Sequence, residues 1–157
     1  MLWVKTFFGI LFQTILLGIF LYLPALTLNW SDAFLLLTIH FLMTILASAY
    51  LLIVKPESIE ARMNYDSKTQ PKEDRLATTL MFSAIIVGLS LAPIDIFHLN
   101  LSSSFEGSIK NIGLAIYIIG MLLFMASINA NEFAETTVNI QEERGQKVID
   151  TGIYSMV

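Results

Sequence analysis

Few residues of this chain could carry out chemistry inside an apolar environment. His40 lies in the middle of a long uncharged run, and an ionisable group in such a position is a functional candidate by default. A neutral histidine is nevertheless easier to bury than an aspartate or a lysine, and Thr38 and Thr44 lie near it in the sequence. We therefore interpret His40 as an interior, hydrogen-bonded residue, in preference to a proton relay or a ligand.

The other ionisable candidates do not predict a metal site or thiol chemistry. Asp95 and His98 are three positions apart at the edge of an uncharged run, but a metal site needs three or four ligands in a defined geometry. The chain has two histidines and no cysteine, so we expect no metal ion, no disulfide and no thiol nucleophile. No Ser/His/Asp set and no phosphate-binding glycine loop stands out, and the catalytic residues stay unassigned.

The elements that must position these residues are membrane-spanning helices. Of the 157 residues, 55% are apolar and 14% are charged, whereas roughly 25% are charged in a typical soluble domain. Uncharged runs of about 20 residues can cross a hydrocarbon core as helices, which satisfy their own backbone groups in lipid. The sequence therefore predicts an all-α integral membrane helical bundle. Its four predicted spans cover residues 6–28, 33–54, 76–94 and 111–131.

Two features refine this bundle. Small residues recur at regular intervals in the third and fourth spans, at Ala84, Gly88 and Ala92 and at Gly113, Gly120 and Ser127. Such ridges favour close helix packing over ligand contact, within the chain or between chains, and the oligomeric state stays open. Pro93 is expected to end the third span or to kink its last turn.

The basic residues are distributed unevenly. Lys5, the five Lys and Arg residues between the second and third spans, Arg144 and Lys147 would share one side of the membrane, and Lys110 alone would lie on the other. Cytoplasmic loops are rich in Lys and Arg, so we expect both termini in the cytoplasm. The chain then divides into a four-span region, residues 1–131, and a cytoplasmic segment, residues 132–157.

The polar tail carries the most specific pattern. It reads Asn131-x-Phe133 and then Ile140-Gln141-Glu142-Glu143-Arg144-Gly145-Gln146-Lys147-Val148-Ile149-Asp150-Thr151-Gly152-Ile153-Tyr154. A weaker pattern lies upstream, in Lys55-Pro56-Glu57 with Arg62 and then Asp74-Arg75. Together these segments resemble the isoprenylcysteine carboxyl methyltransferase family. That family includes related bacterial membrane methyltransferases and is similar to the phospholipid N-methyltransferases.

The resemblance implies methyl transfer from S-adenosylmethionine to a lipidic or membrane-associated acceptor. The acceptor would be a carboxylate of the prenylated-cysteine type or an amine. Family members bind the cofactor at the cytoplasmic face, here expected to be that of a bacterial inner membrane, and no nucleic acid is expected as a partner. Tyr154 would lie where the cofactor and lipid-substrate sites join. By resemblance, the cofactor contacts fall on Asn139, Gln146, Lys147, Val148 and Ile149.

The chain also departs from the family pattern. Gln146 stands where His is common, and Ile153 where Pro is frequent. The family continues with an Arg-His-Pro-x-Tyr motif, a further hydrophobic segment and an acidic pair, whereas this chain ends at Val157. We therefore expect residues 132–157 to be the truncated start of the cofactor-binding region, inactive alone.

The alternative is a non-enzymatic four-helix membrane interaction module or a degenerate relative. Without the resemblance, Val148 and Ile149 would be interpreted as packing on the fourth helix.

The predicted topology can be tested with a single cysteine, because the chain has none. We expect a cysteine introduced at Ser67, in the loop rich in basic residues, to react with a membrane-impermeant maleimide only from the cytoplasmic side. Labelling of intact cells from the outside would contradict this orientation.

Overall fold

The computed structural model describes residues 1–63, 71–101, 107–131, 133 and 147–156 of the chain. The elements, in order, are α1 (Leu2–Ala25), α2 (Ser31–Val54), α3 (Pro56–Met63), α4 (Lys72–Ile94), the π-helical turn η1 (Asp95–Leu99), α5 (Gly107–Ala130) and the 3-10 helix η3 (Gly152–Met156). The described residues form helices and no strand, and four of the helices are long and apolar enough to cross a membrane. The predicted all-α class with four spans is confirmed.

The helices do not start where the uncharged runs start. α4 begins at Lys72 and α5 at Gly107, so both take charged residues into their first turns. A helix can extend beyond the hydrocarbon, where charged side chains reach the polar interface. α1 ends at Ala25, earlier than predicted, because Leu26 adopts a left-handed conformation with φ 55°. Its N–H bonds to the carbonyls of Tyr22 and Leu23.

Pro93 shapes the end of α4. Its side chain is fully buried, and a proline has no N–H to donate to the preceding turn. α4 ends one residue later, at Ile94, and the chain continues as η1 to Asn100, which has φ 50°. Asparagine tolerates the left-handed conformation better than most residues. The candidate membrane span continues through η1 to Leu99. The predicted end of the third span at residue 94 is therefore too early, because beside Pro93 the helix changes from α to π instead of ending.

α1 is the helix that contacts the largest number of other elements in the described chain. It contacts α2 and α4 extensively and also touches α3 and η1. Its fully buried residues are Thr6, Ile10, Leu21 and Ala25. A Cβ added at Gly18 would lie 3.5 Å from the Cδ1 of Leu37 on α2. This distance is an ordinary van der Waals contact, so α1 and α2 are packed side by side at Gly18 with room for a methyl group.

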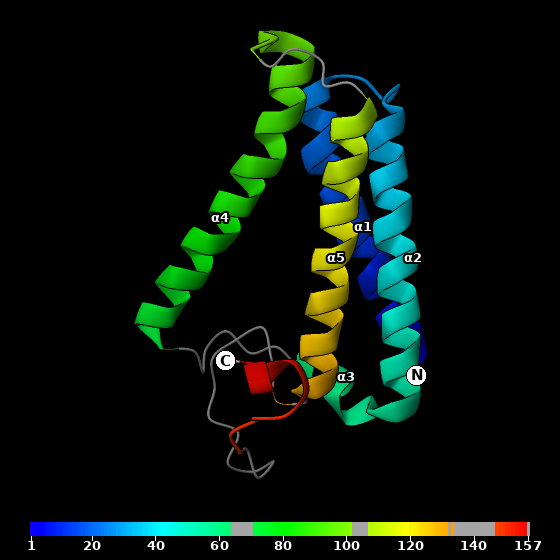
Figure 1. The fold of residues 1–157 in the computed structure, drawn as a ribbon, viewed down its shortest axis with the longest axis vertical. Coiled ribbons are helices and arrows are strands. Elements are labelled where there is room, and N and C mark those ends of the chain that lie inside the picture. Colours follow the sequence, from blue (N-terminus) through cyan, green and yellow to red (C-terminus); the bar gives the residue numbers. More distant parts are fainter. Residues whose placement is uncertain (64–70, 102–106, 132, 134–146, 157) are drawn as a thin grey trace.

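α4 packs on α1 alone among the spans and, in the described chain, does not touch α2 or α5. Figure 1 shows α4 leaning away from the other three spans toward the end that carries α3 and both termini. The small-residue ridges predicted to pack are open within this chain. A Cβ added at Gly88, Gly113 or Gly120 would meet no atom within 4 Å.

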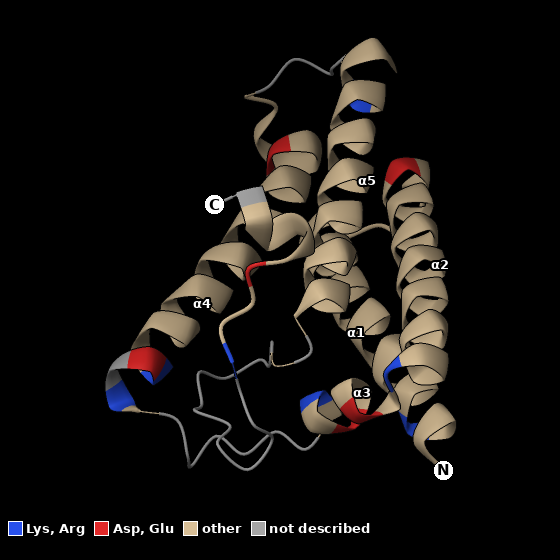
Figure 2. Ribbon diagram, turned by 60° about the horizontal axis from the view of Figure 1, so that its bottom comes forward, with Lys and Arg blue, Asp and Glu red and all other residues tan. Residues whose placement is uncertain are grey.

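The bundle has two distinct ends (Figure 1). Met1, α3, the start of α4 and residues 147–156, which we call the C-terminal segment, lie at one end, which we call the terminal end. The connection from α1 to α2, η1 and the start of α5 lie at the other, which we call the loop end. Figure 2 shows the charged residues of the described helices near these ends, with nearly uncharged spans between them. This distribution is typical of a multi-pass membrane protein.

Candidate functional site

In the described chain, three polar contacts join α5 to α2 and to Lys55, the residue that follows α2. They pair Asp32 with Lys110, His40 with Tyr117 and Lys55 with the backbone carbonyl of Asn129. The distances between the bonded atoms are 2.6, 2.7 and 2.6 Å in that order. Both helices run from the loop end to the terminal end, so the pairs lie at three successive depths of the bundle. α2 and α5 are therefore parallel neighbours fixed in register by polar groups.

The middle contact settles the environment of His40. Its side chain is 7% exposed, and its Nδ1 is bonded to the hydroxyl of Tyr117, 77 positions away. The prediction of an interior, hydrogen-bonded histidine is confirmed, but the threonines near it in sequence are not its partners. Thr38 donates to the carbonyl of Phe34 within α2. The one sequence signal for Tyr117 is a hydroxyl in the middle of a predominantly apolar span.

Two polar atoms remain unpaired at this depth. His40 Nε2 and Thr44 Oγ1 are both buried and have no hydrogen-bond partner in the described structure. They belong to residues four positions apart, which share one face of α2. An unpaired polar atom in an apolar environment is unfavourable by roughly 1–3 kcal/mol in protein mutational data, so substitutions in this layer have predictable signs.

Asp95 and His98 have structural partners at the loop end. The Asp95 carboxylate accepts a hydrogen bond from the N–H of Leu101, at 2.8 Å, which closes the chain after η1. His98 donates from Nε2 to the carbonyl of Pro24, at 2.7 Å, which ties η1 to α1. Within the described residues, no group of three or more His, Cys, Asp or Glu side chains could hold a metal ion.

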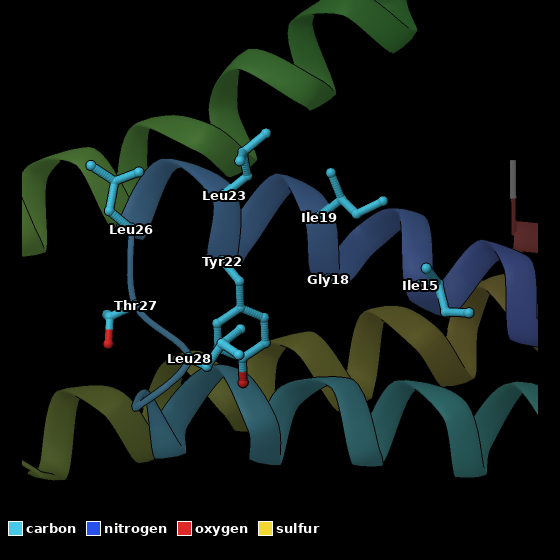
Figure 3. Close-up of a pocket in the computed structure, with 8 residues that line it drawn as sticks. All are labelled: Ile15, Gly18, Ile19, Tyr22, Leu23, Leu26, Thr27 and Leu28. Carbon is cyan, nitrogen blue, oxygen red and sulfur yellow. The ribbon is translucent and has the colours of Figure 1, made fainter.

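An apolar groove lies on α1 near the loop end. It measures about 550 Å³ and is lined by α1 from Ile15 onward and by the connection as far as Leu28. Figure 3 shows Leu23 and Leu26 on the side that faces α4, and Tyr22 pointing toward α2. No charged residue lines this groove. It suits hydrocarbon better than a charged cofactor, and it does not coincide with the predicted cofactor segment.

The C-terminal segment returns to the carboxyl end of α5. η3 packs against α5, and a Cβ added at Gly152 would lie 3.3 Å from the Cβ of Ala130. Gly152 has φ 62°, a conformation that glycine adopts without the penalty of a side chain. Tyr154, the predicted substrate-binding residue, is half-buried in η3, and its N–H donates to the carbonyl of Thr151. Tyr154 therefore lies at the terminal end, in the helix that packs on α5.

Of the predicted cofactor residues, Lys147, Val148 and Ile149 lie in the described chain, whereas Asn139 and Gln146 lie outside it. Lys147 is exposed, Ile149 is half-buried and Val148 is 91% exposed. Val148 therefore does not pack on the fourth helix, which contradicts the alternative interpretation of that residue. Cofactor contact by these residues stays a prediction.

Comparisons of this chain with protein-family models, with curated proteins and with solved structures found no match. The family resemblance therefore rests on the two sequence patterns alone. The fold brings parts of these patterns together. Lys55 and Arg62, from the loop pattern, donate to the carbonyls of Asn129 and Asn131, where the chain enters the tail pattern.

Removal of the Tyr117 hydroxyl should destabilise the bundle. We expect Tyr117→Phe to lower the free energy of unfolding by about 0.6–1.7 kcal/mol, the range of interhelical hydrogen bonds in a membrane, because both ring nitrogens of His40 then lack partners. Reversible unfolding in mixed micelles measures the difference. Tyr50→Phe, at an exposed tyrosine of α2, is the control and should leave stability unchanged. Equal effects of the two variants would contradict the role of the bond.

Replacement of Thr44 should have the opposite sign. We expect Thr44→Val to raise the free energy of unfolding by about 1 kcal/mol, because it removes a buried hydroxyl that has no partner while keeping the shape of the side chain. The control is Thr38→Val, at an exposed threonine bonded within its own helix. The same unfolding assay applies. A destabilised Thr44→Val protein would show that the hydroxyl is bonded.

Proposed function

We propose that this chain is part of a membrane methyltransferase that uses S-adenosylmethionine and acts on a lipidic or membrane-associated acceptor. The observation that carries the proposal is the meeting of the two patterns at the terminal end. The Nη2 of Arg62, in the loop pattern, lies 3.5 Å from the carbonyl of Asn131, the first residue of the tail pattern. Lys55, also in the loop pattern, donates to the carbonyl of Asn129, two positions before the tail pattern, at 2.6 Å. Segments that are remote in sequence, and that both contribute to the resemblance, thus form one end of the bundle.

The position of this end supports the proposal. A polar cofactor must arrive from water, whereas a lipidic acceptor must arrive from the membrane. η3 packs on α5 and lies at the end of the bundle that also carries α3 (Figure 1). We further propose that this end faces the cytoplasm of a bacterial inner membrane, because eight of the nine Lys and Arg residues fall on it or in the segments that adjoin it.

The residues of the segment fit the chemistry of the cofactor. When bound, S-adenosylmethionine supplies a methyl group already activated on a sulfonium. Lys147 and Asp150 are exposed and carry the opposite charges that its carboxylate and ammonium groups need, and Val148 offers an apolar surface. The protein must also align the acceptor with the methyl group and exclude water. Tyr154, half-buried beside these residues, is the group we assign to the acceptor side.

Cofactor binding tests the proposal directly. Because residues 132–157 are expected to be only the start of the cofactor-binding region, the test uses the protein extended by the C-terminal motif and hydrophobic segment that the resemblance predicts. We expect labelled S-adenosylmethionine to bind saturably to this extended protein in nanodiscs. Val148→Asp should weaken this binding about tenfold, the lower end of the effect of altering one apolar contact in a pocket. Leu101→Asp is the matched control, because Leu101 is also apolar and 80% exposed but lies at the loop end. Equilibrium dialysis measures both dissociation constants.

The outcomes of this experiment are distinct. No measurable binding by protein that retains its helical circular dichroism would overturn the proposal. Binding that is weakened equally by Val148→Asp and Leu101→Asp would remove the cofactor from the predicted segment.

A non-enzymatic membrane interaction module is the second candidate. It is favoured by the open small-residue faces, since Gly113 and Gly120 have no neighbour within 4 Å of an added Cβ. Small residues allow another transmembrane helix to approach closely. Failure of folded protein to bind the cofactor would leave this candidate in place of the enzyme.

A further inference from the structure

Lys55 lies at the meeting point of two helix carboxyl ends. α2 ends at Val54, and the backbone N–H of Lys55 closes it by donating to the carbonyl of Leu51 at 2.7 Å. The ammonium of the same residue donates to the carbonyl of Asn129, in the last turn of α5, at 2.6 Å. Carbonyls in the last turn of a helix have no partner within that helix and carry the negative end of its dipole. One cation thus caps α5 from the end of α2.

Arg62 makes a related contact from α3. Its Nη2 lies 3.5 Å from the carbonyl of Asn131, which is at the long limit for a hydrogen bond. Lys55 and Arg62 are seven positions apart, and their acceptors are two positions apart where the chain leaves α5. The shorter contact, from Lys55, is the one that carries the inference.

α3 and the end of α2 give Lys55 a firm base. Ser58 and Ile59 are 2% and 7% exposed. Ile59 belongs to the apolar cluster at the end of α2, and Ile128 of α5 packs against that cluster. This packing holds the last turns of α5 against the end of α2. The Lys55 hydrogen bond adds a directional contact at the same place, so it helps to set the direction in which α5 ends.

The direction in which α5 ends matters because Phe133, before the C-terminal segment, and Gly152, within it, lie near the last turn of α5. Phe133, just beyond α5, is 8% exposed. Gly152 lies against Ala130, with 3.3 Å between an added Cβ and the alanine Cβ. The chain therefore leaves the last turn of α5 and returns to it, so residues 147–149 and Tyr154 are placed relative to that turn.

We propose that Lys55 is a positioning residue, which places the C-terminal segment by capping the carboxyl end of α5. The hydrogen bond of Lys55 goes to α5 and not to the C-terminal segment. Lys55 therefore acts on the C-terminal segment through α5. The identity of the segment as a cofactor site rests on the proposed function above, whereas the capping role does not. The proposal explains in physical terms why a lysine stands at the start of the weak loop pattern, residues 55–62.

The test uses Lys55→Met, which keeps the length of the side chain and removes its donor. Hydrogen–deuterium exchange of the full chain in nanodiscs reports on the cap, since the N–H of Asn131 donates to the carbonyl of Ser127 at 2.9 Å. We expect exchange in residues 126–133 and 151–156 to accelerate about tenfold, as a lost charge-assisted hydrogen bond implies. Lys55→Arg should restore slow exchange. Lys5→Met, at an exposed lysine in the first turn of α1, is the control.

The dissociation constant of S-adenosylmethionine is the second readout. We expect Lys55→Met to raise it about tenfold and Lys55→Arg to return it to the wild-type value. Unchanged exchange in Lys55→Met would overturn the capping role, whatever the cofactor does. Faster exchange with an unchanged dissociation constant would overturn the positioning of the cofactor segment.

Two further results keep the two proposals separate. If wild-type protein binds no cofactor while Lys55→Met accelerates exchange, the proposed function falls and the cap stands. If Lys55→Met does not fold, Lys55→Gln, which has a shorter donor, replaces it in the experiment. We then expect a partial acceleration of amide exchange in the same residues. Exchange at the wild-type rate would contradict the proposal.

Discussion

In a bilayer, α5 depends on polar contacts with α2 for its place. None of its residues is fully buried, and apolar side chains gain little by exchanging lipid for another helix. The pairs Asp32–Lys110 and His40–Tyr117 and the bond from Lys55 to α5 act at three depths, so they fix both the distance and the register of the two helices. The Asp32–Lys110 pair at the loop end is half exposed, so it contributes little to stability. The middle and terminal contacts therefore hold α5.

The rest of the bundle is built on a different principle. α1 packs side by side with α2 at Gly18, and α4 packs on α1 alone among the spans. α4 and α5 are thus attached to different members of the α1–α2 pair and do not touch each other in the described chain. Their outward faces are apolar and meet lipid. A lipidic acceptor would reach the terminal end along such faces without crossing a packed interface.

The cations of the terminal end are divided between two tasks. Lys55 and Arg62 donate to backbone carbonyls near the end of α5, so part of their hydrogen-bonding capacity is used within the fold. Lys147 is exposed in the C-terminal segment. Of these three cations, Lys147 is thus the most exposed to water and to an anionic group of a ligand. The electrostatics of this end follow from which basic residues face carbonyls and which face water.

The sequence by itself determined the helical class, the four spans and the interior histidine, because lipid imposes local demands: about 20 uncharged residues for each span and a paired group at each buried polar position. Only the tertiary structure decided that His40 pairs with Tyr117, that Lys55 caps α5 and that the glycine faces lie open. The bonded pairs are 77 and 74 positions apart in the sequence. Likewise, the resemblance predicted a site at residues 147–149 and Tyr154, whereas only the fold packed η3, which contains Tyr154, against α5. These contacts depend on how whole helices pack against one another. No local pattern of residues determines which residues, more than 70 positions apart in the sequence, come into contact.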